Sequence, residues 1–111
     1  MIKKALIVRS PYAGMVVDGI KTFEMRSTST KIRGTVGIIE AGTGLIIGEV
    51  TIRDSIKFSL EERKNFQRFH KVEDLSLLEK WCWGWFITDA KRYKNPKKYD
   101  HPQGAVIWVN L

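Results

Sequence analysis

The segment Gly19–Arg26 carries the densest group of chemically useful side chains, with an ammonium, a carboxylate and a guanidinium close together. In an extended chain from Thr22, Glu24 and Arg26 project to one face, because strand side chains alternate with period two. Lys21 joins them only if the turn that opens the segment re-aims it, which a glycine permits. The segment can therefore form a compact polar site.

Each of these side chains has a possible chemical role if the site lies in a partly dry cleft. Lys21 can act as a base or stabilise an oxyanion, Glu24 can orient a water, and Arg26 can fork onto a phosphate or carboxylate. The alternative is a structural ion pair between Glu24 and Arg26, since such pairs imitate functional sites. Tyr12 can face the same cleft, or it can simply pack on the body of the protein.

Upstream of this segment the sequence predicts a strand, a short helix and a turn. Residues 5–8 form an apolar run typical of a buried strand. Ser10 is placed to cap the next helix, with Pro11 as its first residue. Apolar residues recur at helical spacing up to Val17, and Gly19 ends the helix. The charged segment therefore starts at a helix end.

Downstream, four runs have the character of strands. The β-branched runs 35–41 and 45–56 flank a Gly-Thr-Gly turn and predict a hairpin. Strands are also expected at 83–87 and 105–109, joined by a basic loop that contains two prolines. In the run 81–86 tryptophans alternate with smaller residues, which favours core packing over stacking of a nucleobase.

Two helices are expected between these strands. Ser59 opens the first, which extends to about His70, and Glu62 is placed for a capping box. Asp74 caps the second, over residues 75–80. A helix pair inserted among strands indicates an α+β fold rather than an alternating α/β sheet.

Composition limits the class of protein. A chain of 111 residues is expected to form one domain, 1–111. Nineteen Lys and Arg against twelve Asp and Glu give a net charge of +7, which attracts phosphates or other anions. One cysteine and two histidines make no disulfide and no zinc cluster, so we expect no metal and no cofactor. The first apolar run ends too early for a signal peptide or a membrane segment, and a cytoplasmic location is expected.

The basic segment near the C-terminus mixes phosphate-pairing cations with aromatic rings. This mixture is typical of proteins that bind single-stranded nucleic acid, although a solvated surface loop has a similar composition. The candidate nucleic-acid-binding residues are Lys91, Arg92, Lys94, Lys97, Lys98 and Tyr99, with Tyr93 interleaved among them.

The spacing G-x-K-x-x-E-x-R of the charged segment resembles the signature of ASCH domains, which are small PUA-like barrels linked to RNA. The resemblance extends over nearly the whole chain, through the segments 11–14, 85–90, 96–99 and 103–108. It implies an α+β fold, namely a PUA-like β-barrel with a short helix after the first strand and a helical insert before the last two strands. It also implies a cleft lined by the charged motif, and on this basis we expect the charged groups at the rim of that cleft.

Two functions follow from the residues and the resemblance together. The favoured one is a binding module whose cleft takes an RNA nucleotide or a modified base through Tyr12, Lys21, Glu24 and Arg26. The other is a small metal-free hydrolase, an amidohydrolase or ribonuclease, with Lys21 and Glu24 as catalytic residues. Some ASCH proteins act on acylated cytidines with a motif lysine, a hydroxyl residue at the position of Glu24 and a later carboxylate, so this chain departs from that pattern at Glu24. Glu49 is either the later carboxylate or a solvent-facing strand residue. A third function, a protein-interaction adaptor, explains the net positive charge less well than either of these two functions. The expected partner is RNA, single-stranded nucleic acid, or a nucleoside or nucleotide.

Overall fold

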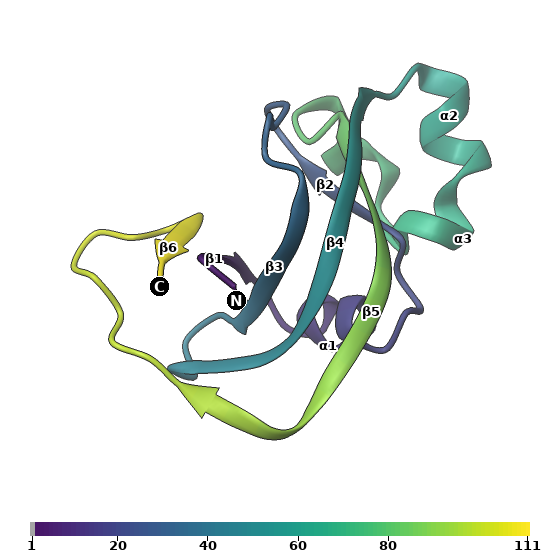
Figure 1. Cartoon of the computed structure of the whole chain (residues 1–111). Coiled ribbons are helices and arrows are strands. Elements are labelled where there is room, and N and C mark those ends of the chain that lie inside the picture. Colours follow the sequence, from purple (N-terminus) through teal and green to yellow (C-terminus); the bar gives the residue numbers. More distant parts are fainter. Residues whose placement is uncertain (1) are drawn as a thin grey trace.

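A mixed six-stranded sheet forms the body of the protein in a computed structural model that describes residues 2–111. The sheet order is β2-β5-β4-β3-β1-β6, with β1 parallel to β3 and the other neighbouring pairs antiparallel. The sheet curls into a half-barrel that is open at β2 and β6 (Figure 1). The strands are β1 (Lys4–Val8), β2 (Phe23–Arg26), β3 (Gly34–Glu40), β4 (Leu45–Lys57), β5 (Trp83–Lys98) and β6 (Trp108–Asn110).

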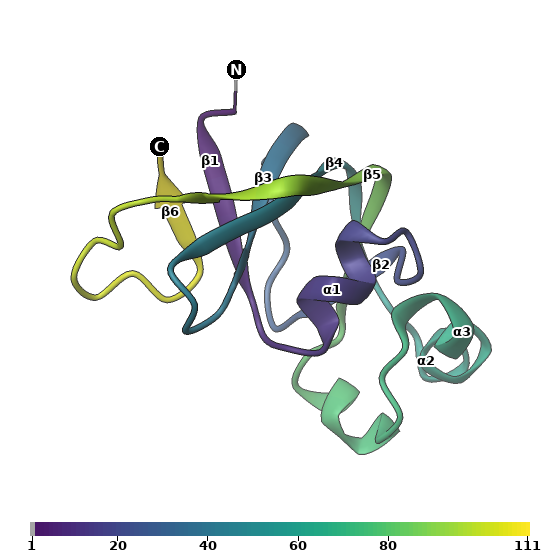
Figure 2. The same ribbon diagram turned by 90° about the horizontal axis from the view of Figure 1, so that it is seen from below.

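Short helices complete an α+β architecture. Helix α1 (Tyr12–Val17) lies between β1 and β2 in the chain. A helical insert between β4 and β5 consists of α2 (Leu60–Asn65), α3 (Gln67–His70) and a 3-10 helix, η1 (Leu75–Glu79). Figure 2 shows α1 and the insert on the same side of the curled sheet.

The helix boundaries differ from the sequence expectation in two places. Helix α1 starts one residue late, because the Pro11 carbonyl accepts the first intrahelical bond, from Met15 N–H at 3.3 Å, and Pro11 is therefore the N-cap. The continuous helix expected from Ser59 to His70 is broken at Phe66. The ring of Phe66 packs against those of Phe23 and Phe58, at centroid distances of 5.9 and 5.5 Å.

The caps expected from sequence are present at two helices. Ser59 Oγ accepts from Glu62 N–H at 3.2 Å, and Glu62 Oε1 accepts from Ser59 N–H at 2.9 Å, which completes a capping box. Asp74 Oδ1 accepts from Ser76 N–H at 3.1 Å at the start of η1. Local sequence therefore determines where the insert begins.

The last two strands are also bounded differently than expected. The basic segment was expected as a loop, but residues up to Lys98 belong to β5, because β4 is long enough to pair with them. The ladder resumes at Ile46↔Lys97 after an irregularity that accommodates Pro96, which has no N–H to donate. Strand β6 begins only at Trp108, three residues later than the strand expected from Ala105.

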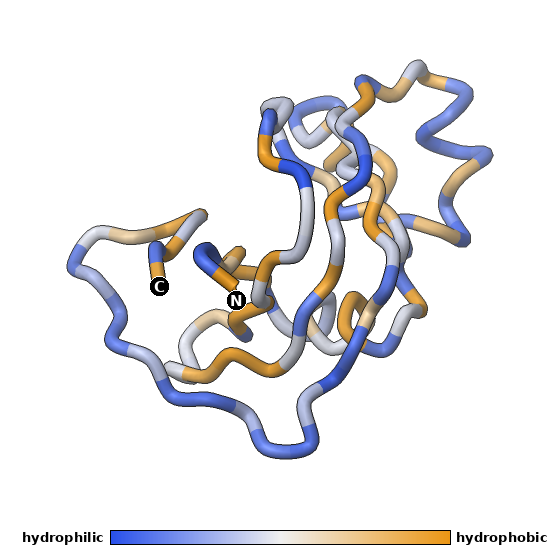
Figure 3. The backbone as a smooth tube through the Cα atoms, in the orientation of Figure 1, coloured by the Kyte–Doolittle hydropathy of each residue, from blue (hydrophilic) through white to orange (hydrophobic). Residues whose placement is uncertain are grey.

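Apolar side chains pack on both faces of the sheet. On the face covered by α1, the core includes Val17, Ile47 and Trp85. On the other face a smaller cluster contains Ile46 with Ala5, Ile39 and Val109. Figure 3 shows these apolar stretches along the central strands and α1, whereas the connection from β5 to β6 is mostly hydrophilic.

Core packing is confirmed for Trp85, which is 2% exposed and stacks on Trp108 at a centroid distance of 6.0 Å. The space beside Gly84 is filled by a ring of the protein itself. A Cβ at Gly84 would lie 2.5 Å from an edge atom of the Phe58 ring. Stacking of a nucleobase at this strand is therefore not available to Trp85.

Gly48 lets α1 approach the sheet, which gives a prediction about stability. A Cβ at Gly48 would clash with the backbone carbonyl of Lys91 and lie 2.7 Å from a Val17 methyl. We expect Gly48→Ala to lower the free energy of unfolding by about 1–3 kcal/mol or more, measured by urea denaturation. Gly14→Ala is the matched control, since its Cβ would meet only the flexible tip of Arg92, 3.2 Å away, and alanine favours helix. Equal stability of wild type and Gly48→Ala would contradict this packing.

Candidate functional site

The turn after α1 determines where the charged segment points. Gly19 adopts a φ of 75°. Its N–H donates to Val16 O at 3.2 Å, and Ile20 N–H donates to Met15 O at 3.0 Å. These two bonds form a Schellman motif, which turns the chain sharply at the helix end. Lys21 therefore lies before β2. Had it been part of that strand, the alternation of side chains would have placed it on the face opposite Glu24 and Arg26.

Three charged side chains meet beyond this turn. Glu24 Oε2 accepts from Arg26 Nη2 at 2.8 Å, and its Oε1 lies 3.9 Å from Lys21 Nζ. Arg26 Nη2 also donates to Ile7 O at 2.7 Å, which ties β2 to β1. Lys21 Nζ donates to the backbone carbonyl of His70 at the end of α3. The carboxylate therefore lies between two cations that are themselves held by backbone carbonyls.

The expectation of a rim position is wrong for Lys21 and Glu24. Lys21 is 1% exposed and Glu24 is 6% exposed, whereas the Arg26 side chain is 20% exposed. All three line a cleft of about 590 Å³, a size that suits a small ligand. Lys21 and Glu24 are buried because the helical insert closes over Lys21, where Thr22 N–H donates to Phe69 O at 2.9 Å.

The walls of the cleft come from segments far apart in the chain. Arg9 comes from the connection between β1 and α1, and Tyr12 is the first residue of α1. Leu77 and Trp81 come from the connection between β4 and β5, and Val106 from the segment before β6. The Tyr12 ring centroid lies 4.9 Å from Lys21 Nζ. The cleft thus has a charged floor and largely apolar or aromatic walls.

Burial changes the acid–base behaviour of Lys21. Loss of hydration lowers the pKa of Lys21 to about 8, with the Glu24 carboxylate opposing the shift and the Arg26 cation adding to it. Near neutral pH a lysine of this kind exists in both charged and neutral forms. It can therefore donate to an anion or serve as a base.

His70 is a part of the site that sequence reasoning missed. Its imidazole is fully buried, with Nε2 2.6 Å from Arg63 O and Nδ1 accepting from Val72 N–H at 3.0 Å. Burial lowers the pKa of His70; the bond to Arg63 opposes this and the Lys21 charge adds to it. A neutral ring with both nitrogens bonded fixes the end of α3, whose carbonyl holds Lys21. Nothing in the local sequence distinguishes this histidine from a surface residue.

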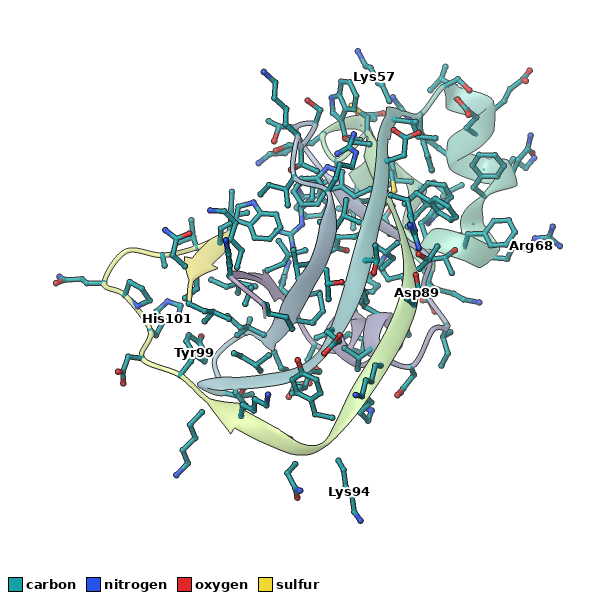
Figure 4. The ribbon with its side chains drawn as sticks, in the orientation of Figure 1. Lys57, Arg68, Asp89, Lys94, Tyr99 and His101 are labelled. Carbon is teal, nitrogen blue, oxygen red and sulfur yellow. The ribbon has the colours of Figure 1, made fainter. Side chains whose placement is uncertain are left out.

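Glu49 and part of the basic segment lie away from the cleft. Glu49 lines a different hollow, where its Oε1 accepts from Tyr93 Oη at 2.9 Å. Arg92 is clamped to Asp18 by bonds of 2.6 and 3.0 Å, and Tyr99 Oη lies 2.8 Å from His101 Nδ1. Figure 4 shows Tyr99 and His101 side by side in the C-terminal connection.

Four lysines of the basic segment remain exposed along the second half of β5. They are Lys91, Lys94, Lys97 and Lys98. Figure 4 shows the Lys94 side chain directed away from the sheet. Among residues 2–111, the part of this strand beyond Ile87 pairs with β4 alone, because β2 pairs with Trp83–Phe86. The lysines therefore follow an open edge of the sheet.

Two classes of feature are not found in residues 2–111. No three His, Cys, Asp or Glu side chains come close enough together to hold a metal ion. None of the helices in this range has the length and apolar character needed to cross a membrane.

Comparison with known proteins identifies the fold. The ASCH domain family matches residues 6–104. The crystal structure of ASCH from Zymomonas mobilis is 12% identical and superposes with a TM-score of 0.75, covering 97% of this chain and 86% of that one. Its tyrosine-to-phenylalanine variant, also 12% identical, gives 0.76 with coverages of 100% and 91%, and its serine-to-alanine variant, at the same identity, gives 0.74 with 97% and 87%. At this identity the likeness shows the fold alone. No curated protein matches the chain.

The buried ammonium of Lys21 predicts an unusual dependence of stability on pH. Between pH 8 and 10.5 the unfolded chain keeps the lysine proton and the folded chain loses it, so the contribution of Lys21 to the free energy of unfolding rises with pH. The rise is on the order of 3 kcal/mol across this window. Urea denaturation of wild type and Lys21→Met at both ends of the window measures it as a growing difference between the two proteins. Tyr93, whose pKa is raised, is present in both and cancels. A difference independent of pH would show that Lys21 is not buried.

Proposed function

We propose that this chain, which belongs to the ASCH domain family, binds RNA or a nucleotide through the charged cleft. RNA binding is generally proposed for this family. The observation that carries the proposal is that buried Lys21 and Glu24 and partly buried Arg26 meet on the floor of one cleft. Charged groups held in place and partly shielded from water bind a complementary ligand at little cost of reorganisation.

The donors of Arg26 favour a ligand with acceptor atoms. Its Nη2 serves both Glu24 and Ile7, and within residues 2–111 no acceptor lies within hydrogen-bonding distance of its Nη1 or Nε. Two cations and one carboxylate leave the floor with a net positive charge, and Arg9 on the wall adds another. A phosphate or a base carbonyl meets these requirements. The rings of Tyr12 and Trp81 offer faces for a planar base.

The exposed lysines of β5 give the longer contact that a strand of RNA requires. Lys91, Lys94, Lys97 and Lys98 are assigned to the phosphate backbone. Arg92 and Tyr99 are already bonded to Asp18 and His101, so their contribution to RNA binding is smaller. We propose that residues 1–111 act as one ASCH domain in this role.

A second candidate function is hydrolysis of an acylated cytidine or of RNA. The lowered pKa of Lys21, at about 8, favours it, because a lysine that deprotonates near neutral pH can act as a general base. Glu24 would then orient the attacking water. Binding and hydrolysis use the same floor and differ in whether product forms.

The cleft proposal is tested with Arg26→Gln and Lys21→Met, measuring affinity for cytidine monophosphate and a short RNA by calorimetry. We expect each variant to bind at least about tenfold more weakly, because a charged hydrogen bond contributes roughly 1.5–3 kcal/mol. Lys21→Met removes a buried charge without opening a large cavity, so it is expected to remain folded. Arg33→Gln is the control, since Arg33 is exposed and its partner is Asp54 at 3.7 Å.

Turnover of an acylated cytidine by the same proteins separates the two functions. Wild-type turnover that Lys21→Met abolishes would establish the hydrolase, whereas binding without turnover supports the binding module. Folded variants with wild-type affinity and wild-type rate would overturn the assignment of this cleft.

The lysines of β5 are tested by changing Lys94, Lys97 and Lys98 together to glutamine. If all three contact phosphates, the slope of log affinity for RNA against log salt concentration becomes shallower by up to about 3 units. The control changes Lys57, Lys64 and Lys80, which are exposed on and around the helical insert, and removes the same charge. Equal slopes for the two triple variants would show that only overall charge matters.

A further inference from the structure

We propose that the sheet carries a second ribonucleotide-binding site, on the face opposite α1, where Glu49, Tyr93 and Lys97 line a hollow. This inference rests on the proposed RNA-binding function and extends it from one cleft to both faces of the sheet. The hollow has a volume of about 700 Å³, and its lining includes Thr35 and the apolar side chains of Ile46 and Leu111.

The position of the hollow follows from a bulge in β4 at Ile47. Ile38 pairs with Gly48 and Ile39 with Ile46, so Ile47 is an extra residue and the alternation shifts by one there. Ile47 packs in the core on the α1 side, and Ile46 packs in the cluster on the other side. Val50 lies in the core on the α1 side, and its neighbour Glu49 therefore shares the opposite face with Ile46. Glu49 is cross-strand neighbour to Gly37, which has no side chain to cover it. The carboxylate therefore remains accessible from the face that lies away from α1.

An irregularity in β5 opens the hollow. Arg92 pairs with Gly48 and Lys97 with Ile46, so four residues of β5 stand opposite the single residue Ile47. Strand β5 bows away from β4 there, as an extended bulge does. Tyr93 and Lys97 stand at the two ends of the bow.

Glu49 presents a free acceptor in this hollow. Its Oε1 accepts from Tyr93 Oη at 2.9 Å, and within residues 2–111 its Oε2 has no donor. Burial together with the bond to Glu49 raises the pKa of Tyr93 to about 12, so the phenol keeps its proton and its direction of donation. The side chain of Glu49 is therefore held still while one oxygen stays available to hydroxyl groups.

Lys97 supplies the complementary donor. Its Nζ lies 5.0 Å from the centroid of the Tyr93 ring, and no carboxylate of residues 2–111 lies within ion-pair distance of it. The ammonium is thus attracted to a neutral ring instead of being neutralised. It is free to pair with a phosphate that enters the hollow.

These groups match the parts of one ribonucleotide. A carboxylate oxygen accepts from a ribose hydroxyl, an ammonium pairs with a phosphate, and apolar walls with a tyrosine accommodate a base. A simple anion is a poorer ligand, because the charge of Glu49 offsets that of Lys97. A deoxyribonucleotide is also a poorer ligand, because it lacks the 2′-hydroxyl that would donate a hydrogen bond to Glu49.

The test compares binding of an oligouridylate of about twelve nucleotides with that of its 2′-deoxy counterpart, by fluorescence anisotropy. We expect wild type to prefer RNA by about tenfold, the effect of one hydrogen bond to a charged group. Glu49→Gln should lose most of this preference with DNA affinity unchanged or increased, and Lys97→Gln should weaken both ligands. Glu61→Gln, an exposed carboxylate of α2, is the control and should keep the preference.

Failure of this inference is distinguishable from failure of the proposed function. Tight binding of RNA and DNA with equal affinity, or an RNA preference that survives in folded Glu49→Gln, would overturn the second site and leave nucleic-acid binding intact. Absence of binding to either oligonucleotide would overturn both.

Discussion

Burial of the Lys21 ammonium is the interaction on which the arrangement of the cleft depends. An ammonium removed from water costs several kcal/mol unless oxygen atoms and opposite charge surround it. Here those partners come from separate elements: the carbonyl of His70 at the end of α3, Glu24 on β2 and the ring of Tyr12 on α1. Removing any one of these elements would take away part of the compensation for a buried charge. The cation therefore couples the helical insert to the sheet and to α1.

The same coupling prepares the site for a ligand. Glu24 is shared between Lys21 and Arg26, so its charge orients both cations without fully neutralising them. Arg26 Nη2 is fixed by its hydrogen bond to the carbonyl of Ile7 in β1. This bond holds the guanidinium in one orientation and so sets the direction of its other N–H donors. Side chains held in this way lose little freedom when a ligand binds, and that favours recognition of a specific geometry over general attraction of anions.

How far the sequence predicted this structure depended on the range of the interactions. The turn at Gly19, the shared face of Glu24 and Arg26, and the caps at Ser59 and Asp74 arise from residues within a few positions of each other, and all could be read from the chain. The burial of Lys21 and the role of His70 arise from a contact across 49 positions, which no local pattern encodes. The strand character of the basic segment was missed for the same reason, because pairing with β4 overrides the local signal of Pro96.

The pairing of β4 with β5 also explains how one sheet can present two different faces to a ligand. On one face, α1 packs closely against the sheet at the Gly48↔Arg92 pair, and Arg92 is bonded there to Asp18 at the end of the helix. Immediately afterwards β5 bows outward and opens the hollow of Glu49 on the other face. Between the two faces runs the open edge of β5 with its exposed lysines. Charged side chains at such an edge disfavour pairing with another sheet edge. Because no strand of residues 2–111 pairs with that edge beyond Ile87, no strand separates the lysines from either face. In the proposed function, a flexible polyanion that follows these lysines would have access to both faces.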